Sequence, residues 1–171
     1  MTGPGRHRLV VPVADLLRRP GSSRVEHREA VLDGLAVSGS AVPEGEPVVV
    51  DARLESVNEG IVATGHLRAP WRGECRRCLR PVASELETTL LEVFEPEPVE
   101  GETRRLHGTT IDLEPVAREA VLLELPLAPL CTEACRGLCD QCGADLNEDP
   151  AHTHEAPADP RWSPLDALKF D

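Results

Sequence analysis

The six cysteines of this chain lie in two short stretches, and no other feature constrains the fold as strongly. They are Cys75 and Cys78 in the middle of the sequence and Cys131, Cys135, Cys139 and Cys142 further along. A C-x-x-C turn directs two thiolates at one tetrahedral ion, and a glycine after the second cysteine, as at Gly143, lets backbone N–H groups turn toward the sulfurs. A disulfide between cysteines three apart would be strained, and no signal peptide is evident that would send the chain to an oxidising compartment. The spacing therefore predicts metal ligands.

The distances between ligand pairs along the chain predict two metal sites. All four thiolates of the second stretch could share one ion, but the linker 136–138 is far shorter than the roughly twelve residues that usually separate two pairs. Two imidazoles follow downstream, at His152 and His154. We therefore group the ligands into an all-thiolate set and a mixed set. The first set is Cys75, Cys78, Cys131 and Cys135, and the second is Cys139, Cys142, His152 and His154.

Each set offers four sulfur or nitrogen ligands, which is the usual coordination of a structural zinc site. The expected cofactor is Zn²⁺, as one or two structural ions. The all-thiolate site would tie the middle of the chain to its C-terminal third. Reduced thiols and a solvated histidine pair are the alternative interpretation of the same residues.

The remaining composition is that of one domain with a small appendage. The chain has 171 residues and only 2% aromatic residues, so its core must be aliphatic. We expect an antiparallel β-rich domain over residues 1–130 and a metal-binding segment over residues 131–171. No apolar run approaches the roughly 20 residues that a membrane span needs, which predicts a cytoplasmic protein with no membrane partner.

Charge is distributed unevenly along the chain. The net charge is −12, which argues against broad electrostatic binding of nucleic acid and makes a basic protein partner plausible. Arginines nevertheless surround the first C-x-x-C pair, whereas residues 85–124 hold eleven acids against three arginines. Four arginines near the pair are candidate RNA contacts: Arg72, Arg76, Arg77 and Arg80. Solvated arginines at a turn are the alternative interpretation.

Apolar periodicity predicts a mixed fold. Alternation favours strands over 47–57, 61–71 and 82–94, with shorter strands over 8–13 and 106–111. The first C-x-x-C loop then joins two antiparallel strands, and His66 lies on a strand surface rather than in a catalytic site. Helical spacing predicts a core helix over 113–125 behind Asp112 as N-cap, with short helices over 14–19 and near 163–168. The fold class is α+β, a mainly antiparallel β-sheet with one core helix and a C-terminal Cys/His zinc-binding segment.

Several short motifs also occur in a characteristic order. They are C-R-R-C-L at 75–79, I-D-L-E-P at 111–115, L-P-L-A-P-L-C at 125–131, C-R-G-L-C-D-Q-C-G-A-D-L-N at 135–147 and D-P-R-W at 159–162. This order resembles the YceD family of large ribosomal RNA subunit accumulation proteins, over about residues 9–170. The resemblance implies a bacterial, non-enzymatic cytoplasmic factor linked to large-subunit ribosomal RNA. Members of the family vary in how many of these cysteines they keep, which favours a structural metal over a catalytic one.

Three functions compete. The preferred one is a ribosome-biogenesis factor that binds precursor ribosomal RNA, a basic large-subunit ribosomal protein, or both, and that has no small-molecule substrate. The second is a deaminase-like zinc hydrolase, since His27-Arg28-Glu29 precedes a C-x-x-C, but Glu74 replaces the expected proline and no ligand position is left open for water. The third is a thiol redox protein, whose C-x-x-C normally begins a helix, which neither pair does convincingly.

Overall fold

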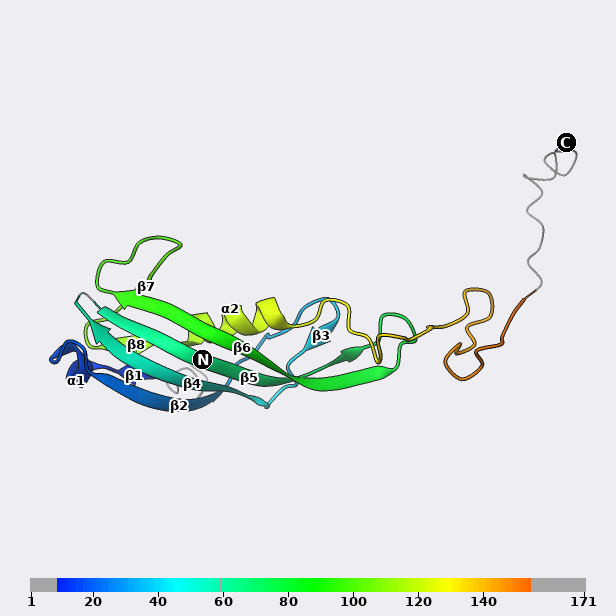
Figure 1. Cartoon of the computed structure of the whole chain (residues 1–171), viewed down its shortest axis with the longest axis horizontal. Helices are drawn as coiled ribbons and strands as arrows, with labels where there is room; N and C mark the ends of the chain where they lie inside the picture. The colour runs from blue at the N-terminus through cyan, green and yellow to red at the C-terminus, as the bar shows by residue number, and fades with distance from the viewer. Residues whose placement is uncertain (1–8, 59, 155–171) are drawn as a thin grey trace, which may run out of the picture.

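The computed structural model describes residues 9–58 and 60–154. The predicted helix near 163–168 lies outside these residues. The elements in chain order are β1 (Val10–Pro12), α1 (Ala14–Leu17), β2 (Ser23–Val31), β3 (Ser40–Ala41), β4 (Pro47–Val57), β5 (Gly60–Glu74), β6 (Pro81–Glu95), β7 (Arg104–Arg105), β8 (Thr110–Asp112) and α2 (Glu114–Glu124). Figure 1 shows a long twisted sheet with α2 on one of its faces.

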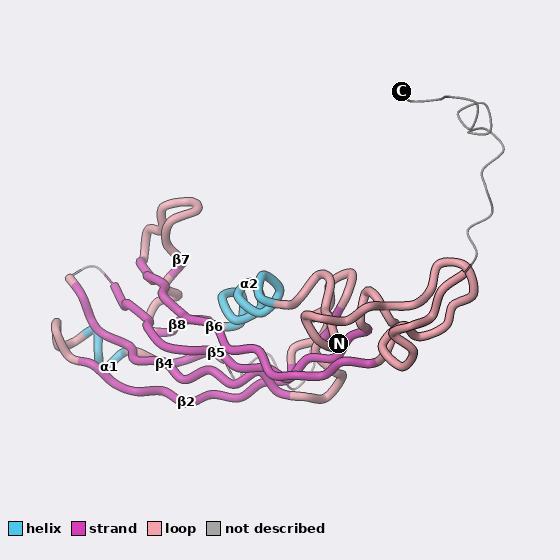
Figure 2. The backbone as a smooth tube through the Cα atoms, turned by 45° about the vertical axis from the view of Figure 1, so that its right-hand side comes forward, coloured by secondary structure: helices cyan, strands magenta, loops and turns pink. Residues whose placement is uncertain are grey.

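The sheet is built around the hairpin of β5 and β6, whose strands have 15 residues each. Its strand order is β2-β4-β5-β6-β7, with β3 paired to the far end of β5. All of these pairings are antiparallel except the short pairing of β6 with β7. The hairpin runs on past β2 and β4 to the pairing with β3, and its closing loop, which contains Cys75 and Cys78, lies toward the same end as the loops that follow α2 (Figures 1 and 2).

The core lies between one face of this sheet and a second layer made of α2, α1 and the β1-β8 pair. Alternate residues of β4, such as Val50 and Leu54, are almost completely buried, as the pattern over 47–57 requires. Phe94 of β6 and Val121 of α2 are buried in the same cluster. Apart from Phe94 the buried side chains of this cluster are aliphatic, which confirms the expectation from the low aromatic content.

The prediction for residues 106–114 was partly wrong. A single strand over 106–111 does not form, because Gly108 adopts a φ of 61° and residues 107 and 110 close a turn through backbone hydrogen bonds of 2.9 and 3.1 Å. Strands β7 and β8 flank this turn. The core helix begins at Glu114 with Leu113 as its N-cap, while Asp112 ends β8. The Asp112 carboxylate still accepts a hydrogen bond of 2.9 Å from the Glu114 N–H.

Strand β2 was not predicted because its inward-facing positions are charged rather than apolar. Arg24 and Arg28 are half-buried on the inner face of the sheet, and both pair with the Glu26 carboxylate, at 2.7 and 2.8 Å. Inward-pointing charges of this kind protect the edge of a sheet from pairing with other chains. Within the described residues, none of the helices has the length and apolarity needed to cross a membrane.

Candidate metal centres

The closing loop of the β5-β6 hairpin holds Cys75 and Cys78 in a fixed turn. The Cys75 N–H donates to the carbonyl of Arg80 at 2.8 Å, and the Leu79 N–H donates to the carbonyl of Cys75 at 2.9 Å. Leu79 itself has a φ of 60°, a left-handed conformation that is unusual for a branched residue. The turn therefore presents both sulfurs on the same side of the loop.

The segment after α2 brings Cys131 and Cys135 to this turn. It is held there by a backbone hydrogen bond of 2.9 Å from the Arg76 N–H to the Pro129 carbonyl. The Sγ atoms of Cys75 and Cys135 are 3.8 Å apart, and those of Cys78 and Cys131 are 3.5 Å apart. The structure thus brings together the four residues of the predicted all-thiolate set, with every sulfur within 4.8 Å of the others.

The geometry of this group fits zinc. Four thiolates at about 2.3 Å from one Zn²⁺ form a tetrahedron whose edges are about 3.8 Å, close to the sulfur separations in the structure. Cys75, Cys78 and Cys135 are buried, and Cys131 is half-buried. A cluster of buried thiols with no disulfide needs either protons or a cation to neutralise it, and this arrangement suits a structural ion.

Hydrogen bonds set the ionisation of the thiols within the group. Burial opposes the thiolate form of Cys75, but backbone N–H groups of Cys131, Cys78 and Arg77 together lower the pKa of its thiol to about 6. At Cys78 the Arg80 N–H favours the thiolate, yet burial and the neighbouring thiols raise the pKa to about 12. Hydrogen bonds therefore favour the thiolate of Cys75 while burial and the neighbouring thiols disfavour that of Cys78, and a divalent ion bound to the group would favour full deprotonation.

A second loop forms the mixed group. Gly143, at a φ of 75°, lets the chain turn so that its N–H donates to the Cys139 carbonyl and the Cys139 N–H donates to the Ala144 carbonyl, both at 2.8 Å. Backbone N–H groups of Gln141 and Cys142 lower the pKa of the Cys139 thiol. This is the local geometry expected from a C-x-x-C followed by glycine.

The two histidines complete this second group. The Nε2 atoms of His152 and His154 lie 2.9 Å apart, and each is 3.2 Å from the Cys142 sulfur. All four ligand atoms of the predicted mixed set fall within 4.8 Å of one another. Cys142 and His154 are exposed, whereas Cys139 and His152 are half-buried. Two imidazoles and two thiolates suit Zn²⁺, in a site much more open to solvent than the first.

Polar contacts that sequence reasoning missed join the two groups. The Asn147 amide donates to the Cys135 sulfur at 3.6 Å and accepts from the Arg136 N–H at 2.8 Å. The Arg80 guanidinium pairs with Asp145 at 2.7 Å and with Glu148 at 2.5 Å. These contacts hold the second loop against the first group. In the sequence, only the D-L-N of the 135–147 motif, which contains Asp145 and Asn147, pointed to them.

The four candidate RNA-contacting arginines fall into two kinds. Arg77 donates to the backbone carbonyls of Cys135 at 2.7 Å and Glu133 at 3.2 Å, and Arg80 is engaged as described above. Arg72 and Arg76 are exposed, and no side-chain hydrogen bond or ion pair involves them among the described residues. Only the second pair is free to contact a ligand without giving up a contact within the protein.

The deaminase-like signature does not assemble into a site. His27 lies on β2, where its Nδ1 is 2.6 Å from the Asp51 carboxylate, and Glu29 is two residues further along the same strand. Neither belongs to the two Cys/His groups that the described residues form. His66 is exposed on β5, as predicted.

Comparison with known proteins gives the family. Residues 63–169 match the profile of a family described as large ribosomal RNA subunit accumulation protein YceD. This chain belongs to the YceD family. The matched region contains most of the β5-β6 hairpin, α2 and all eight residues of the two Cys/His groups. The family resemblance seen in the sequence motifs is confirmed.

Relatives extend over most of the chain. An uncharacterized protein of Mycobacterium tuberculosis is 39% identical over 165 residues, which cover 92% of this chain and 79% of that protein. One of Mycobacterium leprae is 33% identical, over 92% of this chain and 76% of that protein. A chloroplastic YCED homolog 1 of Arabidopsis thaliana, named as a large ribosomal RNA subunit accumulation protein, is 24% identical over 86% of this chain and 57% of its own length. No solved structure matches this chain.

Proposed function

We propose that this YceD protein is a non-enzymatic, cytoplasmic factor that supports the accumulation of large-subunit ribosomal RNA and that contains two structural zinc ions. The observation that carries the proposal is the family match over residues 63–169, because it includes both Cys/His groups and the hairpin on which they are built. The name of the plant relative associates the family with large-subunit RNA accumulation.

A structural role for the metals is supported by the ligand sets. Each group already supplies four protein ligands, so a bound zinc ion would have no coordination position left for water or substrate. When bound, zinc supplies cross-linking between distant parts of the chain. The residues of the first group would then join the hairpin loop to the segment after α2, and those of the second would close the loop over 139–154. The division of the chain near residue 130 stays a prediction.

The redox alternative is weaker. A reactive C-x-x-C gains its low thiol pKa from a position at the start of a helix. Here Cys75 follows β5, and the pair at Cys139 and Cys142 lies in a loop, with no helix beginning at either pair in the described part of the chain. The low pKa of Cys75 comes instead from backbone N–H groups that also suit a metal-bound thiolate.

The candidate RNA contacts at the hairpin end are Arg72 and Arg76. Both are exposed near the first group: Arg72 lies at the end of β5 that pairs with β3, and Arg76 lies in the closing loop of the hairpin. Arginines fixed by a metal-bound loop can meet phosphates on an otherwise acidic protein. The logarithm of the RNA-binding constant falls linearly with the logarithm of the salt concentration, and each phosphate contact that is lost makes this slope shallower by about one unit. Replacing both arginines should therefore make it shallower by up to about two units.

The test is depletion of the protein followed by complementation. Depletion should lower mature large-subunit RNA relative to small-subunit RNA, and the wild-type chain should restore the ratio. A variant with Arg72→Ser and Arg76→Ser should keep its zinc and fold but fail to restore the ratio if these arginines touch RNA. Full rescue by this variant would remove the RNA-contact role. An unchanged RNA ratio after depletion would refute the accumulation function itself.

A further inference from the structure

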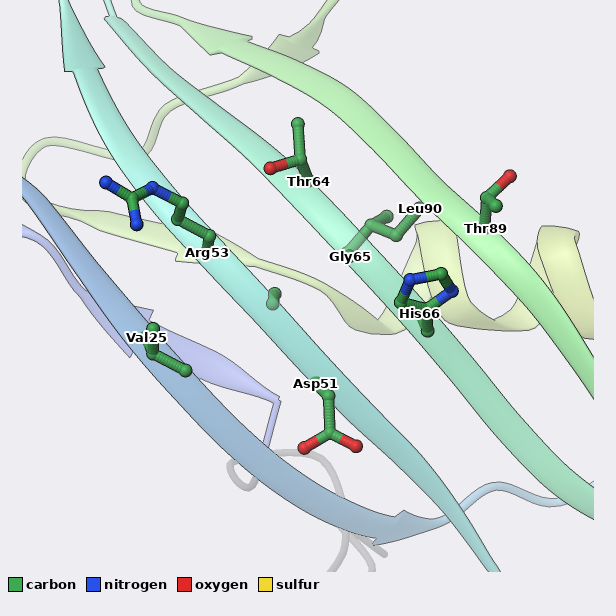
Figure 3. A pocket seen from close by; sticks show the side chains of 9 residues that line it. Val25, Asp51, Arg53, Thr64, Gly65, His66, Thr89 and Leu90 are labelled. Atoms are coloured by element: carbon green, nitrogen blue, oxygen red, sulfur yellow. The ribbon is translucent and has the colours of Figure 1, made fainter.

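No helix or strand of the described residues covers the outer face of the sheet. The strand registers place alternate residues of β2, β4, β5 and β6 on this face, opposite the layer that contains α2. Figure 3 looks onto it, with α2 behind the strands and the side chains of Asp51, Arg53, Thr64 and His66 toward the viewer. A shallow depression of about 550 Å³ lies at its centre.

This face is acidic. Leaving out the hairpin end beyond Pro70, its outward positions on the four strands carry six carboxylates against two arginines, a net charge of −4 with the histidines neutral. Both arginines are already engaged: Arg68 pairs with Asp51 at 2.8 Å, and Arg53 donates to the Ser23 hydroxyl. Glu55 and Glu85 have no partner among the described residues, and Glu87 has only the His66 ring at 3.7 Å.

Apolar side chains lie among these charges. Val25 and Leu91 are 72% and 73% exposed, and they lie in one row across the strands, with Arg53 and Thr64 between them. Val31 and Val57, at 40% and 39%, lie on the same face. An exposed antiparallel face normally consists of solvated polar residues. Here free carboxylates and exposed apolar side chains lie on one face, which suits an extended chain that carries cations on aliphatic stems.

We propose that the outer face of the sheet binds a lysine- or arginine-rich polypeptide segment of a partner protein. This inference rests on the proposed function and gives it a partner class and a surface distinct from the hairpin end. Charge argues against three other occupants. RNA is repelled by the net −4, a second copy of the face would bring −4 against −4, and residues 155–171 of this chain carry four acids against two basic residues.

Binding of two synthetic peptides to the full-length protein tests the proposal. In the first peptide lysine alternates with valine, and in the second glutamate replaces lysine. The face variant replaces Glu55, Glu85 and Glu87 by Gln, and the loop variant replaces Glu97, Glu100 and Glu102 by Gln. All six residues are exposed and both variants lose the same charge, so neither should change the melting temperature by much.

We expect the lysine peptide to bind and the glutamate peptide not to bind. The face variant should weaken binding of the lysine peptide about tenfold, from three surface charge pairs, while the loop variant stays within about twofold. Leu91→Asn should also weaken binding of the lysine peptide. Leu123→Asn, at a similarly exposed position on α2, should not. Equal weakening by both charge variants would mean that net charge alone attracts the peptide, and it would overturn the proposal.

Three other results would also overturn it: no binding of the lysine peptide, a dimer that the face variant dissociates, or an RNA fragment whose binding needs the same three glutamates. These outcomes are separable from failure of the proposed function. If the purified chain does not bind the peptide, depletion can still lower large-subunit RNA. If depletion leaves the RNA ratio unchanged, the purified chain can still bind the peptide.

Discussion

Arg77 should stabilise the first metal group although it is not a ligand. Its guanidinium donates to the carbonyls of Cys135 and Glu133, and its own carbonyl accepts the Leu138 N–H at 3.1 Å. Arg77→Ala removes the two side-chain hydrogen bonds and leaves the backbone contact. The change should therefore loosen the 131–135 segment from the hairpin loop without removing any sulfur from the group.

The size of the effect follows from these two bonds. A hydrogen bond from a charged donor is worth up to about 3 kcal/mol when buried, but the Arg77 side chain is largely exposed, so about 0.5–1.5 kcal/mol each is reasonable. Together they contribute about 1–3 kcal/mol to the state in which the four sulfurs are gathered. That corresponds to a loss of zinc affinity of about fivefold to 150-fold at the first group. The zinc affinity of the second group should change little.

Competition between the protein and a graded series of zinc chelators measures this loss. Arg76→Ala is the matched control, because Arg76 is the exposed neighbour whose side chain makes no hydrogen bond or ion pair among the described residues. In Arg77→Ala we expect one of the two zinc ions to be removed by chelators of lower zinc affinity than the wild-type protein requires. In Arg76→Ala we expect zinc removal to match the wild-type protein. Equal behaviour of the two variants would refute the structural role of Arg77 and return it to the candidate RNA contacts.

Three further predictions concern the metals and one titrating side chain. Protein purified without chelator should contain about two zinc ions per chain by elemental analysis, and a value near one would reject the two-site grouping. Cys78→Ser should lower the melting temperature of the whole chain, while His154→Ala should release one zinc ion and leave the main transition in place, since its loop lies outside the core. Hydrogen bonds that the His27 ring donates to the Asp51 and Glu29 carboxylates raise the pKa of His27, so its contribution to stability is fully present below pH 6.5 and is lost as pH rises through the raised pKa. His27→Gln should thus lower the melting temperature at pH 6 but not at pH 9, and an equal drop at both would show that the ring acts by packing.

Much of this fold could be predicted from local pattern. Alternation identified β4, β5 and β6, because each of these strands buries one face and exposes the other. The helix after residue 112 followed from apolar spacing, although its first residue differed by one. The sequence spacing of cysteines and histidines also predicted which ligands could share an ion, since a C-x-x-C pair acts as one unit and only a second pair can complete a tetrahedron.

Other features of the fold depend on contacts between distant parts of the chain. Strand β2 has charged residues at its inner positions, so no apolar pattern marked it. Their burial is compensated by the pairing of Arg24 and Arg28 with Glu26 and of Arg24 with Asp15. Likewise, four arginines that look alike in the sequence separate into two that hold the metal loops together and two that face solvent. Ligand spacing is a local property that can be counted along the chain. The partner of a long charged side chain depends on which distant backbone comes within reach, and folding of the whole chain settles that.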